Sequence, residues 1–294
     1  MRDQTKVIRA FSIIACLLAL AGVAIAQMPA APPLSVKPLT GDVYWTQGGA
    51  GGNTGIIVGK DGVTVVDAKM TAESAKEMLA DIAKITPKPV TDVILTHSDA
   101  DHVNGLAGFP MGLTIIAQEN CKKEMEASAN SRMPAPAAYM PTKTVDKKET
   151  TTIDGVRIEM LHFAPAHTSG DLIVYLPEQK IVFTGDIVAA QLPYPIIHLE
   201  KNGSSEGWIE TMKGILALNA DTFVPGHGDL QTRADLEKRL ANTEARREKI
   251  KELVAQGKTL EQVKEALGET AGPGAAAPRF PTFTEVVYKE LSKS

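Results

Sequence analysis

A segment that follows an apolar run carries four candidate metal ligands within six positions. They are His97, Asp99, Asp101 and His102, in a chain with only six histidines. The preceding run, Val90–Thr96, predicts a buried strand, so these side chains are expected where that strand ends. Imidazole nitrogens and carboxylate oxygens at this density are the ligands of Zn²⁺ and similar divalent ions. The alternative, a polar loop with capping carboxylates, does not account for three more histidines in metal-like contexts.

The first 26 residues have the pattern of a secretory signal peptide. Basic residues open the chain, residues 11–26 are almost wholly apolar, and Ala24-Ile25-Ala26 fits a cleavage site, so the mature chain is expected to begin at Gln27. The apolar stretch is too short to predict a membrane span. We therefore expect a periplasmic or secreted protein with no stable membrane insertion after cleavage.

Composition narrows the possible partners. The net charge is −4, and the signal peptide carries an excess of basic residues, so the mature chain is more acidic still. An acidic chain is a poor partner for nucleic acid or an anionic membrane surface, which favours a small-molecule substrate. Cys16 leaves with the signal peptide and Cys121 remains alone. No intramolecular disulfide is then possible, and stability must come from the core and bound metal.

Short strands alternate with helices through most of the chain. Residues 27–38 are predicted as a flexible leader, 39–230 as the main domain and 231–294 as a C-terminal helical extension packed on it. Gly59-Lys60-Asp61-Gly62 lies between two apolar runs and predicts a hairpin. Three prolines make residues 130–145 a predicted loop. The predicted helices are Thr71–Ile85, Glu119–Ala129, Ser204–Leu218, Arg233–Ala255, Thr259–Leu267 and Phe283–Leu291.

Three further predicted strands end in a histidine or an aspartate beside glycine. His167, Asp186 and His227 are these residues, within PAHTSGD, TGD and PGHG. Irregular backbone at such positions can turn a side chain into a common cleft. Each short motif is a weak signal, but the ordered set of four is specific.

Together these motifs resemble those of the metallo-β-lactamase fold superfamily over roughly residues 40–230. The family's first motif, H-x-H-x-D-H, matches at His97, Asp101 and His102, with Asp99 in place of the second histidine. The resemblance implies a mixed α/β fold, a four-layer αββα sandwich, with a dinuclear metal cleft along one edge of its two sheets. It implies a first ion held by His97, Asp99 and His167, a second held by Asp101, His102 and His227, and Asp186 as the bridge.

Two departures from the family pattern bear on the chemistry. Asp186 stands where true metallo-β-lactamases have cysteine or serine, whereas thioesterases, lactonases and phosphodiesterases of the fold have a bridging aspartate. Asp99 replaces an imidazole with an anionic oxygen, which adds negative charge beside the first ion. Hard oxygen ligands favour Fe or Mn, so these ions are alternatives to Zn²⁺.

The resemblance implies an exported metal-dependent hydrolase in which a metal-bound hydroxide cleaves an ester, thioester, lactone or amide bond. Asp101 is the candidate catalytic proton shuttle. Asp67, at a predicted strand end, is a candidate hydrogen-bond partner of a ligand histidine, and His198 is a candidate lining residue of the substrate cleft. A secreted class B-like β-lactamase and an iron-containing oxidoreductase of the same fold are the alternatives.

Overall fold

The computed structural model describes residues 31–269 and 280–292. The predicted signal peptide and residues 27–30 of the predicted leader lie outside the described residues. So do residues 270–279, before the last helix, and residues 293 and 294.

The first sheet has seven strands in the order β1-β2-β3-β4-β5-β6-β7. The neighbouring strands from β1 to β4 pair antiparallel, and those from β4 to β7 pair parallel. Their bounds are β1 Ser35–Thr40, β2 Val43–Gln47, β3 Thr54–Val58, β4 Val63–Val66, β5 Val90–Ile94, β6 Thr114–Gln118 and β7 Lys143–Val145. The predicted hairpin is confirmed as β3 and β4. Two predictions are wrong in part, because the leader continues into β1 and the loop at 130–145 ends in β7.

The second sheet has five strands in the order β12-β11-β10-β9-β8. Their bounds are β8 Lys148–Ile153, β9 Val156–Leu161, β10 Ile173–Leu176, β11 Ile181–Ala189 and β12 Thr222–His227. Strand β8 was not predicted. Its residues alternate between exposed and half-buried positions, so it has no apolar run.

Seven α-helices lie in the described residues, and most begin at a capping side chain. They are α1 Ala72–Ile85, α2 Ala100–Val103, α3 Glu119–Ala127, α4 Ser205–Ala217, α5 Arg233–Ala255, α6 Leu260–Ala266 and α7 Phe283–Leu291. The hydroxyl of Thr232 caps α5 and that of Thr282 caps α7, each within a reciprocal capping box. None of the helices in residues 31–269 and 280–292 has the length and apolar character to cross a membrane.

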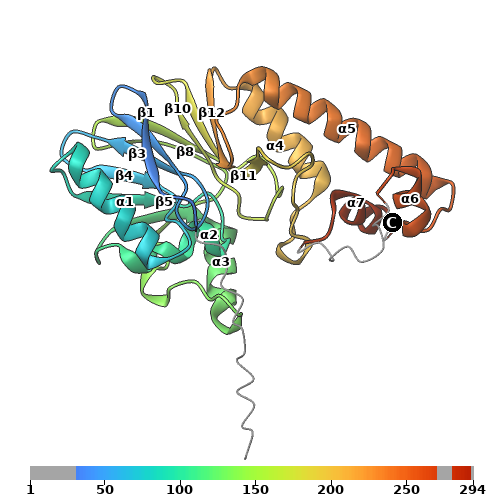
Figure 1. Ribbon diagram of the computed structural model, residues 1–294, viewed down its shortest axis with the longest axis horizontal. Helices are drawn as coiled ribbons and strands as arrows, with labels where there is room; N and C mark the ends of the chain where they lie inside the picture. Colours follow the sequence, from blue (N-terminus) through green and yellow to red (C-terminus); the bar gives the residue numbers. More distant parts are fainter. Residues whose placement is uncertain (1–30, 270–279, 293–294) are drawn as a thin grey trace, which may run out of the picture. The chain divides into compact units, whose positions relative to one another are not determined.

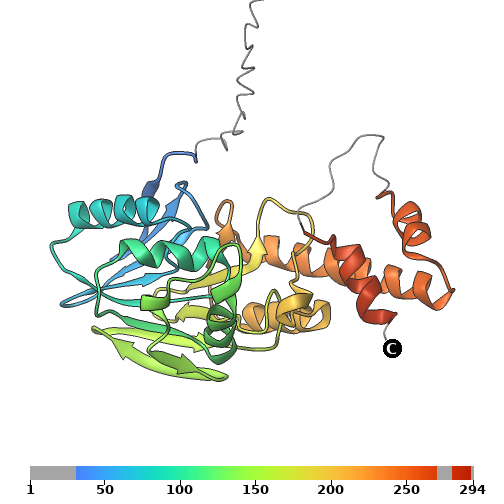
Figure 2. The same cartoon turned by 90° about the horizontal axis from the view of Figure 1, so that it is seen from below.

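Three hydrophobic clusters separate four layers (Figures 1 and 2). One lies between the first sheet and helices α1 and α3, a second between the two sheets, and a third between the second sheet and helices α4, α5 and α7. Neighbouring residues of one strand serve two clusters: Ile56 of β3 faces α1, and Ile57 faces the second sheet. Strands buried on both faces explain the continuous apolar runs of the sequence, and the αββα sandwich is confirmed.

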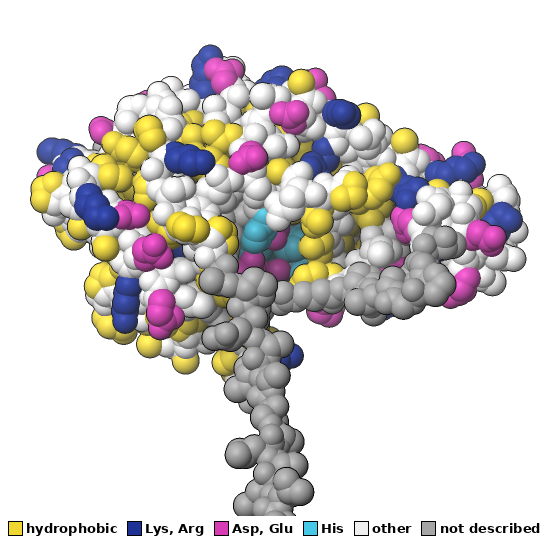
Figure 3. All heavy atoms as spheres, in the orientation of Figure 1, with side chains coloured by type: hydrophobic (Ala, Val, Ile, Leu, Met, Phe, Trp, Pro, Cys, Tyr) yellow, Lys and Arg dark blue, Asp and Glu magenta, His cyan; other side chains and the backbone are white. Residues whose placement is uncertain are grey.

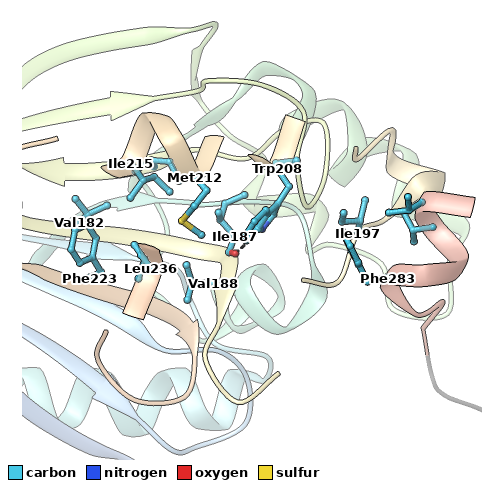
Figure 4. Packing of buried hydrophobic residues seen from close by; sticks show 14 of the residues in the cluster. Val182, Ile187, Val188, Ile197, Trp208, Met212, Ile215, Phe223, Leu236 and Phe283 are labelled. Atoms are coloured by element: carbon cyan, nitrogen blue, oxygen red, sulfur yellow. Dashed lines mark hydrogen bonds between the residues drawn. The ribbon is translucent and has the colours of Figure 1, made fainter. Parts of the chain in front are cut away.

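The C-terminal helices join the core of the main domain (Figure 4). Trp208 of α4 is fully buried, and its indole N–H donates to the carbonyl of Ile187 at 2.9 Å. Leu236 of α5 and Phe283 of α7 belong to the same cluster. Phe283 lies against Ile197, in the segment between β11 and α4 (Figure 4). The C-terminal extension therefore supports a loop that also borders the candidate site.

Lys69 is a charged residue buried in the loop between β4 and α1. Its side chain is fully buried, and the Nζ atom donates to the carbonyls of Gly48 and Gly52 at 2.9 and 2.7 Å. Burial lowers the pKa of Lys69 to about 8. These two bonds hold the glycine-rich segment 48–52 against the main domain.

We expect Lys69→Met to lower the free energy of unfolding by about 1–3 kcal/mol, because two buried carbonyls lose their donor. The pKa of Lys69 is lower in the folded chain, so its buried charge reduces wild-type stability below pH 8. This penalty disappears as the pH rises from about 8 toward the ordinary lysine value near 10.5. The advantage of wild type over the variant should therefore grow over that range. Urea denaturation measures both effects.

Lys76→Met, an exposed change on α1, is the matched control and should alter stability by no more than about 0.5 kcal/mol. Equal unfolding midpoints for wild type and Lys69→Met would contradict the proposed bracing of segment 48–52.

Candidate metal centre

The ends of strands and the loops after them bring five of the predicted ligands together. His97 follows β5, His102 lies in α2, and His227 is the last residue of β12. His167 lies in the loop between β9 and β10. Asp186 was expected at the end of a strand, but β11 continues to Ala189, and Asp186 lies where its pairing with β12 shifts register. Such an irregularity turns a strand side chain away from the regular pleat.

Two glycines allow the backbone to approach these side chains closely. A Cβ on Gly226 would lie 1.9 Å from Oδ1 of Asp186, and one on Gly52 would lie 2.3 Å from Cε1 of His102. Any larger residue at either position would displace the ring or the carboxylate.

The predicted ligands form two sets of three, each with its donor atoms within 4.8 Å of one another. One set is His97, Asp99 and His167, and the other is Asp101, His102 and His227. In the first set, Oδ2 of Asp99 lies 3.2 Å from Nε2 of His167 and 3.8 Å from Nε2 of His97. In the second, Oδ2 of Asp101 lies 3.0 Å from Nε2 of His227. A third group, His97, His102 and Asp186, combines a histidine from each set with the remaining carboxylate.

Asp186 lies between the two sets. Its Oδ1 atom is 3.2 Å from Nε2 of His102, and its Oδ2 atom is 3.5 Å from Nε2 of His227 and 4.0 Å from Nε2 of His167. One buried carboxylate therefore faces donor atoms of both sets.

Three of the histidines are held through Nδ1, which leaves Nε2 facing the cluster. The Nδ1 atom of His102 lies 2.8 Å from Oδ2 of Asp67, and that of His167 lies 2.8 Å from the carbonyl of Ile196. Both acceptors require a proton on Nδ1. The third histidine, His97, has Nδ1 at 2.9 Å from Oγ1 of Thr96. The expected contact of Asp67 with a cluster histidine is thus present.

The Thr96 hydroxyl donates to Oδ2 of Asp67 at 2.7 Å, so it accepts a hydrogen bond from Nδ1 of His97. The Nε2 atom of His97 then carries a lone pair, and it is buried with no hydrogen-bond partner among the described residues. A buried lone pair without a partner is costly unless a cation or proton binds it. This atom is the clearest structural sign that the cluster fits a bound cation.

Burial and mutual charge shift the pKa values in the cluster. Burial lowers the pKa of His97 well below its usual value, and nearby His102 adds to the effect. Burial also acts against the charged form of His167, but its hydrogen bond with Asp99 outweighs this and raises the pKa to about 10. Burial opposes ionisation of Asp101, but nearby His102 and His227 lower its pKa to about 2. The carboxylates of the site are therefore anionic near neutral pH.

Asp99 has polar partners that the sequence did not reveal. It precedes α2, but its side chain makes no capping bond, which excludes the capping alternative for this residue. Instead its Oδ1 pairs with Nζ of Lys201, and its Oδ2 lies 3.2 Å from Nε2 of His198. The expected extra negative charge at Asp99 is thus offset by an ammonium group.

A cavity of about 430 Å³ opens over the cluster. Histidine and acidic side chains are visible together in a hollow of the face shown in Figure 3. His198 and Lys201 line one part of the cavity. Apolar side chains from four separate segments line the rest, namely Met70, Met133, Leu192, Ile196 and Phe280. Sequence reasoning had identified His198 alone among these lining residues, because no local pattern marks the others.

A family model described as "Metallo-beta-lactamase superfamily" matches residues 48–227. The chain is 27% identical over 198 residues to the 2,4-dinitroanisole O-demethylase subunit alpha of Nocardioides sp. (strain JS1661), covering 67% of this chain and 58% of that protein. It is 24% identical over 179 residues to metallo-beta-lactamase type 2 of Bacillus cereus, covering 58% of this chain and 65% of that protein.

Among solved structures, the stereoselective inverting sec-alkylsulfatase Pisa1 from Pseudomonas sp. is similar in fold, with a TM-score of 0.68 and 18% identity. The similarity covers 86% of this chain and 47% of that one. The chain thus spans less than two thirds of the length of each of these three proteins.

Asp67→Asn tests the hydrogen bonds that orient the cluster. The carboxylate accepts from the Thr96 N–H and hydroxyl and from Nδ1 of His102. An amide has one oxygen and would face one of these donors with an NH₂ group. We expect a loss of about 1–3 kcal/mol in unfolding free energy and about a 10–100-fold weaker affinity for added Zn²⁺. Denaturant titration measures the unfolding free energy, and chelator competition measures the affinity for Zn²⁺.

Asp221→Asn is the control, because this side chain is 71% exposed and its ion-pair partner is Lys180, which is not a cluster residue. If Asp67→Asn matched this control in both measurements, Asp67 would have no part in orienting His102.

Proposed function

The chain belongs to the metallo-beta-lactamase superfamily, and from that premise we propose that it is a metal-dependent hydrolase that uses two divalent ions, with Zn²⁺ as the proposed metal. The observation that carries the proposal is the partnerless, buried Nε2 of His97 amid imidazoles turned with Nε2 inward. Imidazoles anchored through Nδ1, with Nε2 turned inward, are the arrangement expected of metal ligands.

The two sets of donors define the proposed ligands. We assign His97, Asp99 and His167 to the first ion, and Asp101, His102 and His227 to the second. Asp186 is assigned as the bridge, since its two oxygens face histidines of both sets. The mix of imidazole and carboxylate donors fits Zn²⁺, and Fe or Mn are the alternatives.

When bound, the ions supply an activated water and polarise the scissile bond of the substrate. The residues of the chain then position and transfer protons. Asp101 is the candidate proton shuttle, because its side chain is 32% exposed at the cavity and its Oδ2 lies beside His227. Asp67 keeps the ring of His102 in one orientation.

The walls of the cavity suggest the kind of substrate. Met133, Leu192 and Phe280 offer an apolar surface beside the charged centre. This combination suits a small molecule with an apolar portion next to a hydrolysable ester, thioester, lactone or amide bond. The similarity to a sec-alkylsulfatase in fold adds sulfate esters to the compounds to be tested.

A β-lactamase is the second candidate function. The 24% identity to a metallo-beta-lactamase of Bacillus cereus favours it. Asp186, in place of the cysteine or serine of true metallo-β-lactamases, weighs against it. We further propose that residues 1–26 direct export, which the mass of the mature protein from a periplasmic or culture fraction would test.

Native protein should contain two divalent ions per chain by elemental analysis, and EDTA should abolish hydrolysis until metal is restored. A panel of ester, thioester, lactone, sulfate-ester and phosphodiester substrates then defines the reaction, with a chromogenic cephalosporin for the β-lactamase alternative. Bound metal with no hydrolysis across the panel would overturn the proposed activity. Redox-active iron in the native protein would favour the oxidoreductase alternative.

Asp101→Asn should reduce kcat by about 10²–10⁴-fold, the range for loss of a positioned proton-transfer group. The amide keeps the size of the side chain but cannot carry the proton. Elemental analysis shows whether the variant still holds the second ion. A loss of proton transfer can then be distinguished from a loss of metal. Asp221→Asn again serves as the control, and near-normal turnover by a metal-loaded Asp101→Asn variant would exclude Asp101 as the shuttle.

A further inference from the structure

Lys201 places a cation at the first ligand set. It ends the short helix η4 (Leu199–Lys201), and it is the single lysine or arginine among the described residues that line the cavity. Its Nζ atom contacts Oδ1 of Asp99 and donates to Oγ of Ser98 at 2.9 Å. The side chain is 26% exposed, so this pair is largely shielded from water.

A chain of hydrogen bonds fixes the position of Lys201. The Ser98 hydroxyl that accepts from Lys201 donates to Oε2 of Glu124 at 2.6 Å. The other oxygen of Glu124 accepts from the hydroxyl of Ser169 at 2.7 Å. These contacts connect η4 with helix α3 and with the loop that carries His167. The ammonium group is thus part of an ordered network.

The two oxygens of Asp99 have different partners. Oδ1 faces Lys201, whereas Oδ2 faces the first histidine set, 3.2 Å from Nε2 of His167. The ammonium therefore selects which oxygen is turned toward that set. It also cancels the charge of the carboxylate, so that the pair is neutral, as an imidazole would be.

We propose that Lys201 is a positioning residue that acts through Asp99, and that the Asp99–Lys201 pair takes the place of the missing second histidine of the first motif. This inference rests on the proposed two-ion centre. The carboxylate offers one oxygen to the first ion, and the ammonium keeps the total charge of the ligand set at the value that a histidine would give. Lys201 then sets both the geometry and the affinity of the first ion position.

Opposite effects of two single substitutions test this charge balance. Lys201→Met removes a positive charge and frees Oδ1 of Asp99, so the first ion should bind about tenfold or more tightly. Asp99→His leaves the ammonium unpaired beside the ion, so the first ion should bind about tenfold or more weakly. The double variant Asp99→His/Lys201→Met restores a neutral pair and should bind with an affinity close to wild type.

Chelator competition measures the affinity of each variant for the first and for the second equivalent of Co²⁺. The visible spectrum of the bound Co²⁺ is recorded as well. Lys201→Met should change this spectrum, because a second carboxylate oxygen becomes free to coordinate. Lys201→Arg retains the cation and should retain the wild-type affinity and spectrum. Thermal melting establishes that each variant is folded.

Weaker binding in both single variants would show a merely structural role for Lys201 and overturn the inference, as would a Lys201→Met variant identical to wild type. Both of these outcomes concern the variants alone and leave the proposed two-ion centre of the wild-type protein intact. Failure of wild-type protein to bind two Co²⁺ ions would instead refute the proposed centre, and this inference with it.

Discussion

The carboxylate of Asp67 is the contact on which the arrangement of the site depends. It lies directly after β4, and its three hydrogen bonds fasten the end of that strand to Thr96 after β5 and to the ring of His102. Through the hydroxyl of Thr96 it also determines the orientation of His97. Asp67 has a φ of 64°, a conformation that costs roughly 1 kcal/mol or more for a residue other than glycine. The bonds to buried donors offset that strain.

Around this contact the chain gathers charges that would be unfavourable if buried singly. Asp186 is buried between imidazoles of both sets, and Asp99 is placed between imidazoles and the ammonium of Lys201. Buried ions are tolerated when they are paired and hydrogen-bonded. At Asp99 the partner is the ammonium of Lys201, whereas the family motif that this segment resembles has a histidine at this position.

Much of the fold was predictable because the sandwich buries both faces of most strands. Apolar runs predicted β3, β4 and β5, and the predicted helices Arg233–Ala255 and Phe283–Leu291 coincide with α5 and α7. Three of the four edge strands, β1, β7 and β8, escaped prediction for physical reasons. Strand β8 is polar on its exposed face, and β1 contains Pro38, which a strand interior seldom tolerates. β7 is only three residues long and follows a proline-rich loop.

The sequence by itself identified the His and Asp side chains that the fold brings together, because the first motif and the three strand-end motifs are local patterns. Their proposed grouping came from the family resemblance. The tertiary structure alone decided what surrounds them. Lys201 meets Asp99 across 102 positions of sequence, and Phe280 reaches the cavity from the C-terminal extension. Such contacts depend on how α4, α5 and α7 pack on the second sheet, and no spacing within the chain encodes them. The motif therefore suggested an excess of negative charge at Asp99, whereas packing supplied the lysine that balances it.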